Sequence, residues 1–126
     1  MGAVSGIERM QRIYPEMRRR GIRVLPGGDY GFPYNPIGRN ARDLKLFVDL
    51  LGFSPIEALV AATRLGGELM GRGDLLGQVK AGYLADLLVV DGDPTMDVVV
   101  LQDRAKLLAI MKDGAFHKRP PAPARA

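Results

Sequence analysis

The sequence predicts an α/β part followed by a part made mainly of β-strands. From Ile7 to Gly71 the apolar residues recur mostly at helical spacing, and one short β-branched run interrupts them. After Gly71 the spacing becomes that of strands, and Asp113–Gly114 separates two apolar runs. Because Asp-Gly suits a two-residue type I′ turn, these runs predict a hairpin. We therefore expect three segments along the chain: residues 1–72, residues 73–118, and a disordered tail at residues 119–126.

The first segment is expected to begin with a helix and a strand. The helix covers Ile7 to Arg20, because its apolar residues are spaced three, three and four apart on one helical face. Pro15 should kink or split this helix, and Gly21 is placed to end it. The β-branched run Ile22–Leu25 then predicts a short strand, which leads into a glycine-rich loop.

Two further helices are expected before residue 72. Asn40 is a plausible N-cap for the first, whose apolar stripe consists of Leu44, Phe47, Val48 and Leu51. Gly52 should end that helix. The sequence Ser54-Pro55-Ile56-Glu57 then supplies a cap, a proline at the first helical position and a glutamate at N3, so it predicts a second start. We expect this helix to run towards Gly66 or Gly67.

The second segment is expected to consist of short strands. Gly77–Gly82 is predicted to be a strand and a turn, and Leu84–Asp91 a buried strand stopped by Gly92-Asp93-Pro94. Val98–Leu101 could be extended or helical. The hairpin strands flank Asp113–Gly114 and are expected at Leu107–Lys112 and Ala115–Lys118.

The composition excludes several classes of function. The 126 residues contain no cysteine and one histidine, so disulfides and thiolate metal sites are excluded and imidazole ligands are scarce. The net charge is +4, and basic residues cluster at Arg18–Arg20 and in the C-terminal tail, without the interleaved aromatics expected of a nucleic-acid surface. Apolar runs are too short to span a bilayer, and Met1–Ile13 lacks the pattern of a signal peptide. We expect a soluble cytoplasmic protein that binds neither nucleic acid nor membrane.

An ordered set of motifs resembles one family, the metal-dependent amidohydrolases, and within it the imidazolonepropionase-like branch. A Gly-Gly-Asp-x-Gly loop comes first, followed by two helix-start motifs, a long Leu-Gly to Gly-Asp-Pro motif and a closing Lys-Asp-Gly hairpin. The matching residues are Gly27–Gly31, Asn40–Leu44, Ser54–Thr63, Leu76–Pro94 and Lys112–Gly114. The loop alone is weak, but the ordered set is specific and covers roughly Ile22 to Phe116.

The resemblance implies a fold that extends beyond these residues. Ile22–Gly28 looks like the eighth strand of a TIM-type barrel, and residues 40–71 look like the helices after it. The strands from Val79 onward look like part of the small β-sandwich beside the barrel. A complete barrel needs roughly 250 residues, so we expect oligomerisation or a partner chain to complete the fold.

Asp29 is the candidate catalytic residue. It follows the predicted strand Ile22–Leu25, at the end where barrel active sites assemble, and the glycines around it permit a sharp turn. The resemblance implies that this carboxylate contacts a divalent metal, most plausibly zinc, and accepts a proton from the water that attacks a carbonyl. The alternative is an aspartate that merely satisfies N–H groups of its own loop.

The sequence supplies too few other ligands to hold a metal. His117, at the end of the predicted hairpin, is expected to lie far from Asp29, and a zinc site needs at least three neighbouring protein ligands. We therefore expect no metal to be bound by this chain alone. The carboxylates at Asp91, Asp93 and Asp97 resemble a calcium-binding cluster but are interpreted as turn residues, because the further ligands and the turn glycine of a full calcium loop are absent. Asp86 is interpreted as structural.

Three aromatic residues follow Asp29 and leave two interpretations open. Tyr30, Phe32 and Tyr34 could line the mouth of a substrate pocket, or they could anchor the loop.

Two functional hypotheses remain open at this stage. One is a fragment or subunit of an amidohydrolase that cleaves amide or cyclic-amide bonds, with a companion chain supplying the histidines. The other is a non-catalytic, self-associating module of the same ancestry. Whether the chain by itself is an enzyme stays undecided, and both hypotheses predict association with another chain because a lone parallel strand leaves two unpaired edges.

Overall fold

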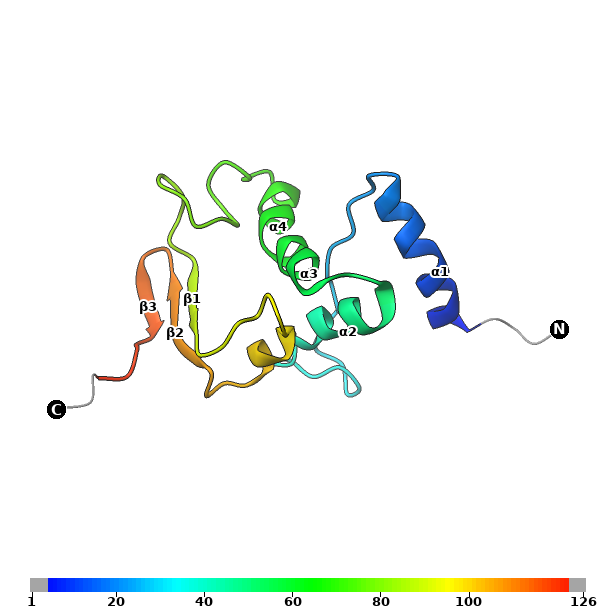
Figure 1. The fold of residues 1–126 in the computed structure, drawn as a ribbon. Helices are drawn as coiled ribbons and strands as arrows, with labels where there is room; N and C mark the ends of the chain where they lie inside the picture. Colours follow the sequence, from blue (N-terminus) through cyan, green and yellow to red (C-terminus); the bar gives the residue numbers. More distant parts are fainter. Residues whose placement is uncertain (1–4, 123–126) are drawn as a thin grey trace.

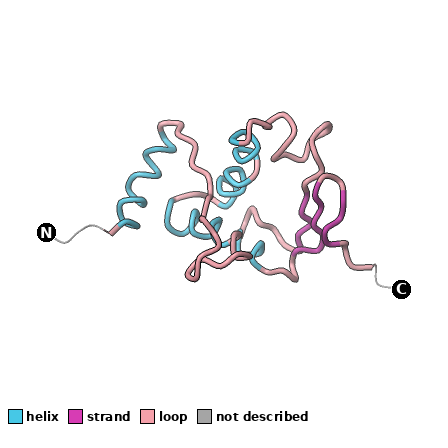
Figure 2. The backbone as a smooth tube through the Cα atoms, turned by 180° about the vertical axis from the view of Figure 1, so that it is seen from behind, coloured by secondary structure: helices cyan, strands magenta, loops and turns pink. Residues whose placement is uncertain are grey.

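The structure, a computed structural model, describes residues 5–122. Its helices gather at one end and its strands form an antiparallel sheet at the other, with α1 and β3 at opposite ends (Figure 1). Seen from behind, the strands again lie to one side of the helices (Figure 2). The elements are α1 (Gly6–Arg19), α2 (Arg42–Leu51), α3 (Pro55–Ala62), α4 (Arg64–Leu69), β1 (Leu87–Val90), the 3-10 helix η1 (Val98–Gln102), β2 (Leu107–Lys112) and β3 (Ala115–Lys118).

The hydrophobic core lies where α2, α3 and η1 meet. The apolar stripe of α2 is buried as its spacing predicts, and Phe53 packs against Phe47 with ring centroids 4.7 Å apart. Ala58 and Ala61 of α3 are completely or almost completely buried, because their small side chains let α3 approach α2 closely. The buried members of this core are Leu44, Phe47, Leu51, Phe53, Ala58, Ala61 and Val98. This core holds the helical end of the molecule together.

Helix α1 contributes no buried residue, but Tyr14 packs against the core and Arg18 contacts the corner between α2 and α3. The Arg18 guanidinium lies 3.8 Å from the centroid of the Phe53 ring and donates a hydrogen bond of 2.8 Å to the carbonyl oxygen of Gly52. It also forms an ion pair with Glu57. Pro15 lies inside a continuous helix, so the helix is not split there. One arginine thus links α1 to the corner between α2 and α3.

The helix boundaries confirm part of the sequence prediction. Ser54 and Glu57 form the expected capping box, and Gly52 ends α2 in the left-handed conformation. The predicted N-cap at Asn40 is wrong: Ala41 occupies that position without a side-chain cap, after a turn in which the Asn40 carbonyl accepts from the Asp43 N–H. The last predicted helix is broken at Thr63, whose hydroxyl donates to the Leu59 carbonyl at 2.7 Å.

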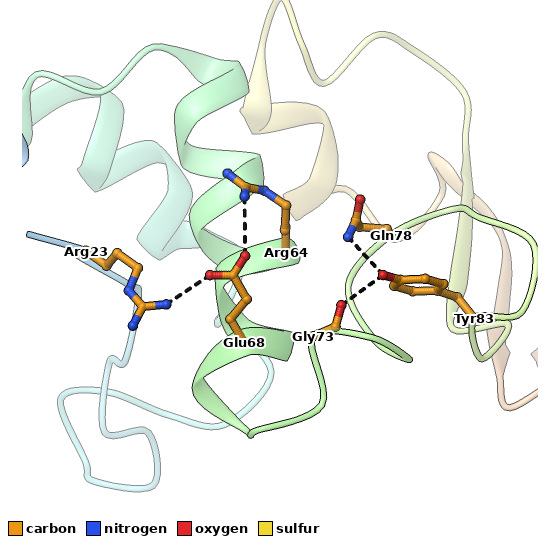
Figure 3. A network of polar contacts seen from close by, with 6 residues as sticks. All are labelled: Arg23, Arg64, Glu68, Gly73, Gln78 and Tyr83. Carbon is orange, nitrogen blue, oxygen red and sulfur yellow. Dashed lines mark hydrogen bonds and ion pairs between the residues drawn. The ribbon is translucent and has the colours of Figure 1, made fainter. Parts of the chain in front are cut away.

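Two glycines allow the loop after α4 to lie directly on the junction of α3 and α4. A Cβ on Gly77 would overlap the Thr63 carbonyl oxygen, and a Cβ on Gly67 would lie 2.5 Å from the Leu76 oxygen. Backbone therefore packs on backbone here. The same loop is fixed by the Tyr83 hydroxyl, which donates to the Gly73 carbonyl at 2.9 Å (Figure 3).

The sheet has the order β1-β2-β3, and both neighbouring pairs are antiparallel. The predicted hairpin is confirmed: Asp113 and Gly114 have φ values of 49° and 77°, which are the positive angles of a type I′ turn. Asp86 stabilises this turn by accepting from Lys112 and from the Asp113 N–H at 2.7 Å. These two donors hold the pKa of the Asp86 carboxyl below its ordinary value.

Three strand predictions differ from the structure. Ile22–Leu25 is extended but belongs to no sheet, because the described residues offer no strand beside it. Gly77–Gly82 forms turns and loop instead of a strand. The strand predicted at Leu84–Asp91 forms as β1, yet Leu88 and Val89 are 54% and 53% exposed, so it is not buried. Among the sheet residues of the described part, Ala109 in β2 is the one that is buried. Residues 5–122 contain no second sheet that would cover the first.

The division at residues 72 and 73 stays a prediction, although the helices and the strands do lie on either side of it. Of the predicted tail at 119–126, residues 119–122 form neither helix nor strand, and residues 123–126 lie outside the described part. Within residues 5–122, no helix combines the length and the apolar content needed to cross a bilayer.

The packing of Gly77 gives a prediction with an internal control. Gly77 and Gly82 both have φ of 86°, but nothing lies within 4 Å of a Cβ built on Gly82. Gly77→Ala and Gly82→Ala should each lose about 1 kcal/mol because of the left-handed backbone. Gly77→Ala should lose about 1–3 kcal/mol more because a methyl group must displace backbone atoms. Urea denaturation of the two variants measures the difference, and equal midpoints would contradict the packing described here.

Candidate functional site

Asp29 lies at the end of an extended segment and projects from an exposed loop. Its φ of 48° places it in the left-handed region, which is unusual for any residue other than glycine. The side chain forms no hydrogen bond or ion pair with the described residues, so no partner within them fixes the carboxylate. Its direction is therefore set by the backbone that carries it.

The extended segment before Asp29 is attached to α4 at its N-terminal end, through Arg23. Arg23 donates to Glu68 of α4 at 2.9 Å, and Arg64 donates to the other oxygen of the same carboxylate at 3.3 Å (Figure 3). From Arg23 to Tyr30, no main-chain group is hydrogen bonded to another main-chain group of residues 5–122. The segment is thus held in place by side chains.

Asn35 holds the loop on the far side of Asp29. Its side-chain amide donates to the carbonyl oxygen of Gly28, and the Asp29 carbonyl lies 3.4 Å from the same nitrogen. Its main chain accepts from Gly31 and donates to Phe32, each at 2.9 Å. Arg42, at the start of α2, donates to the Asn35 side-chain oxygen at 3.0 Å. That last bond fixes which end of the amide faces the carbonyls.

Tyr30 is turned towards α2. Its hydroxyl donates to Asp43 at 2.6 Å, with the Arg39 carbonyl oxygen 3.1 Å away. Burial raises the pKa of the Tyr30 hydroxyl, and the neighbouring Asp43 carboxylate raises it further. Gly28 lies between the two: a Cβ there would overlap the Tyr30 ring and lie 2.6 Å from an Asp43 oxygen. Glycine is therefore required at position 28 for a contact within the chain.

The other two aromatic candidates point into solvent. Phe32 is 58% exposed and Tyr34 is 94% exposed, and neither makes a side-chain hydrogen bond with the described residues. The structure therefore does not bring Tyr30, Phe32 and Tyr34 together around one pocket. A role for any of them in binding substrate stays a prediction, and Tyr30 in addition anchors the loop.

Sequence reasoning missed Asn35, and it gave no role to Arg42 or Asp43. The last two residues belong to the Asn-Ala-Arg-Asp-Leu motif, which pointed to the family but not to their contacts. The available signal for their role was that two polar residues stand side by side at the start of an amphipathic helix. Their partners lie 7 and 13 positions earlier in the chain, across an irregular loop, and periodicity does not reveal such pairs.

A groove of about 530 Å³ runs between α1, the extended segment and α2. Apolar side chains line most of it, including Met10, Tyr14, Val24, Leu25 and Leu46. Asp29 lines neither this groove nor the two smaller cavities near the same loop. The groove is therefore an apolar surface beside the candidate residue and does not enclose it.

No group of three or more histidine, cysteine, aspartate or glutamate side chains within residues 5–122 could hold a metal ion. His117 is exposed in β3, at the sheet end of the molecule. Asp93 accepts from Thr95, and Asp97 caps η1 by accepting from the Val99 N–H, each at 2.9 Å. Asp91 pairs with Lys106. These aspartates therefore serve turns and strand ends, as their sequence context predicts.

Comparison with known proteins gives a consistent assignment. The sequence profile of the amidohydrolase family matches residues 10–116. Ochratoxinase from Aspergillus niger is 29% identical over 110 residues, which cover 86% of this chain and 22% of that protein. Imidazolonepropionase from Rubrobacter xylanophilus is 35% identical over 73 residues, which cover 58% of this chain and 18% of that protein. The chain thus spans about a fifth of the length of these relatives.

Solved structures agree with the sequence matches. The structure of Aspergillus niger ochratoxinase superposes with a TM-score of 0.73 and 28% identity, covering 86% of this chain and 24% of that one. A Xaa-Pro dipeptidase with methionine bound in its active site superposes with a TM-score of 0.74 and 27% identity, covering 86% of this chain and 25% of that one. The helices and the sheet described above therefore have counterparts in larger folds.

The two tyrosines of the loop give a matched stability test. Tyr30→Phe removes the hydroxyl that Asp43 accepts from, whereas Tyr34→Phe removes one exposed to solvent. We expect Tyr30→Phe to lower the free energy of unfolding by about 1–2 kcal/mol, because a half-buried carboxylate loses its donor. Tyr34→Phe should change it by less than about 0.5 kcal/mol. Urea denaturation at neutral pH distinguishes them, and equal stability of both variants would refute an anchoring role for Tyr30.

Proposed function

We propose that this chain, which belongs to the amidohydrolase family, works as the C-terminal part of a hydrolase that acts on carbon–nitrogen bonds. The observation that carries the proposal is Asp29 itself. Its carboxylate is exposed, free of partners among the described residues, and lies in a left-handed turn inside the region that the family profile matches. An aspartate that served only its own loop would accept hydrogen bonds from that loop.

The extended segment Arg23–Tyr30 supports a place in a barrel. Its main-chain donors and acceptors make no main-chain hydrogen bonds with the described residues, and none of its residues is buried, so both of its edges are open to neighbouring strands. An apolar groove runs along it. Strands on both sides would satisfy these groups and cover the groove. On this proposal the segment is the last strand of a TIM-type barrel, residues 1–72 belong to the barrel, and residues 73–118 belong to the adjoining small domain.

The described residues contain no complete set of metal ligands. Members of the amidohydrolase family generally bind divalent metal ions. Residues 5–122 offer Asp29 as a candidate ligand, but they contain no group of three or more histidine, cysteine, aspartate or glutamate side chains that could hold a metal ion. The remaining ligands would have to come from a companion polypeptide or another part of a longer chain, and zinc is the metal we expect there.

The chemistry assigned to Asp29 requires only proton transfer. A carboxylate can accept a proton from a water molecule as that water attacks a carbonyl carbon, and it can later return the proton to the leaving nitrogen. An exposed carboxylate on a fixed backbone suits this role because it can meet a substrate enclosed by other parts of the protein. The substrate would then be selected mainly by residues outside this chain.

A non-catalytic, self-associating module is the second candidate. The observation that favours it is the amount of apolar surface left uncovered on residues 5–122. Large exposed apolar residues occur on α1, on α4 and on the sheet, among them Ile7, Ile13, Leu69, Leu88, Val89 and Phe116. Such surface promotes association whether or not chemistry follows.

Measurements on the purified chain separate the two candidates. On the first proposal the chain binds no stoichiometric zinc, iron or manganese by elemental analysis, and a companion amidohydrolase segment improves its solubility. A single metal-free oligomer by light scattering, unchanged by such a segment, would favour the module. Stoichiometric metal bound by the chain alone would contradict the statement that the ligand set is incomplete.

Replacement of the matching C-terminal part of Aspergillus niger ochratoxinase by this chain tests the role of Asp29. The chimera should hydrolyse the fungal protein's own substrate, and Asp29→Asn in the chimera should lower kcat at least about 100-fold, as expected for loss of an acid–base group. The circular dichroism spectrum should not change. Full activity of Asp29→Asn would refute the assigned role, and a folded but inactive chimera would support the non-catalytic module.

A further inference from the structure

The loop that carries Asp29 is held in an unfavourable shape by residues outside the core. A left-handed backbone is uncommon at residues with a Cβ, although aspartate adopts it more readily than most, so contacts from neighbouring residues help to maintain it at Asp29. The Asp29 side chain is exposed and makes no hydrogen bond or ion pair with residues 5–122. The contacts that remain come from Asn35 and Tyr30.

We propose that Asn35 and Tyr30, held by Arg42 and Asp43 at the start of α2, are positioning residues that orient the Asp29 carboxylate. This inference rests on the proposed function, because it assigns a purpose to the orientation of that carboxylate. It adds Asn35, Arg42 and Asp43, for which neither the sequence motifs nor the family match specifies a role, and it gives a purpose to the anchoring of the loop by Tyr30.

Asn35 constrains the chain on both sides of the Asp29 Cα. Its amide nitrogen faces the carbonyl oxygens of Gly28 and Asp29, and these two carbonyls belong to the peptide units that flank that Cα. Fixing both peptide planes fixes φ and ψ of the residue between them. The direction of the Cα–Cβ bond then follows, and the carboxylate retains only its own side-chain rotations.

Arg42 gives the Asn35 amide its direction. A side-chain amide can rotate by 180° and exchange its donor and acceptor ends, which would place the amide oxygen against two carbonyl oxygens. The guanidinium of Arg42 donates to the Asn35 oxygen at 3.0 Å and stabilises the orientation in which the donor faces the loop. Arg42 is the first residue of α2, so the helix fixes the position of the guanidinium that orients the Asn35 amide.

Tyr30 fixes the residue after Asp29 to the same helix. Its hydroxyl donates to Asp43 at 2.6 Å, and its ring covers Gly28 so closely that no side chain fits there. The following residue of α2, Leu44, is buried in the core. Asp43 therefore holds Tyr30 directly, and Arg42 holds Gly28 through Asn35. The core in turn fixes the helix that carries Arg42 and Asp43. Groups on rigid elements position a reacting group better than groups on a free loop.

Site-specific proteolysis of the whole chain tests the anchoring without requiring activity. A protease that cleaves before aspartate should cut the Gly28–Asp29 bond slowly relative to the Lys112–Asp113 bond in the hairpin turn. In Asn35→Ala and in the isosteric Asn35→Asp, which lacks the donor, that ratio should rise about tenfold, in line with one lost hydrogen bond. Asn40→Ala, at an exposed asparagine of the same loop without a side-chain hydrogen bond, should leave it unchanged. An unchanged ratio in both Asn35 variants overturns the proposal.

Kinetics in the ochratoxinase chimera test the purpose of the anchoring. Asn35→Ala and Tyr30→Phe should lower kcat about tenfold or more while KM stays within about twofold, as expected when the reacting group is misplaced but the substrate still binds. Asn40→Ala should retain the kinetics of the parent chimera. Parent-like kcat in Asn35→Ala overturns the positioning role.

The two proposals can fail separately. If Asp29→Asn retains full activity in the chimera, the proposed function fails, whatever Asn35 does. If Asp29→Asn is inactive and Asn35→Ala is fully active, only the positioning proposal fails. If the chimera itself is inactive, the cleavage ratio in the free chain still decides whether Asn35 holds the loop.

Discussion

Burial of the apolar face of α2 is the interaction on which the helical half of this molecule depends. Leu44, Phe47 and Leu51 anchor the helix to α3 and η1. At its C-terminal end, Gly52 and Phe53 contact the Arg18 guanidinium, which joins α1 to the core together with Tyr14. At its N-terminal end, Arg42 and Asp43 form hydrogen bonds with Asn35 and Tyr30 of the loop that carries Asp29. A hydrophobic contact thereby fixes polar geometry at both ends of the same helix.

Local features of the sequence predicted local features of the structure. Ser54 and Glu57 are three positions apart and form a capping box, and Asp113–Gly114 adopts the positive φ values of its hairpin turn. The prediction at Asn40 failed because the Ala41 backbone is already helical, which leaves no extended residue for a side-chain cap there. The strands predicted at Ile22–Leu25 and Gly77–Gly82 do not form. Residue composition indicates which segments can be extended, but a strand also requires a neighbouring strand, which composition does not identify.

The candidate site was predicted in part for the same reason. Asp29 and its glycines form a contiguous motif, so the sequence and the family resemblance both indicated them. The contacts of Asn35 with Gly28, and of Tyr30 with Asp43, cross an irregular loop whose path no periodicity specifies. Gly28 illustrates the difference. The sequence indicates that this glycine permits a sharp turn, whereas in the structure the absence of a side chain also leaves room for the Tyr30 ring and the Asp43 carboxylate.

The left-handed backbone at Asp29 has a consequence for how such a chain would change over generations. Glycine would adopt φ of 48° with less strain, and the aspartate side chain returns no hydrogen bond to the described fold. Selection for folding alone would therefore favour glycine at this position. On the proposed function, an aspartate retained there would exchange some stability for chemistry, as reactive residues commonly do. Drift at position 29 towards glycine in related sequences would mark lineages in which the chemistry has been lost and the scaffold has been kept.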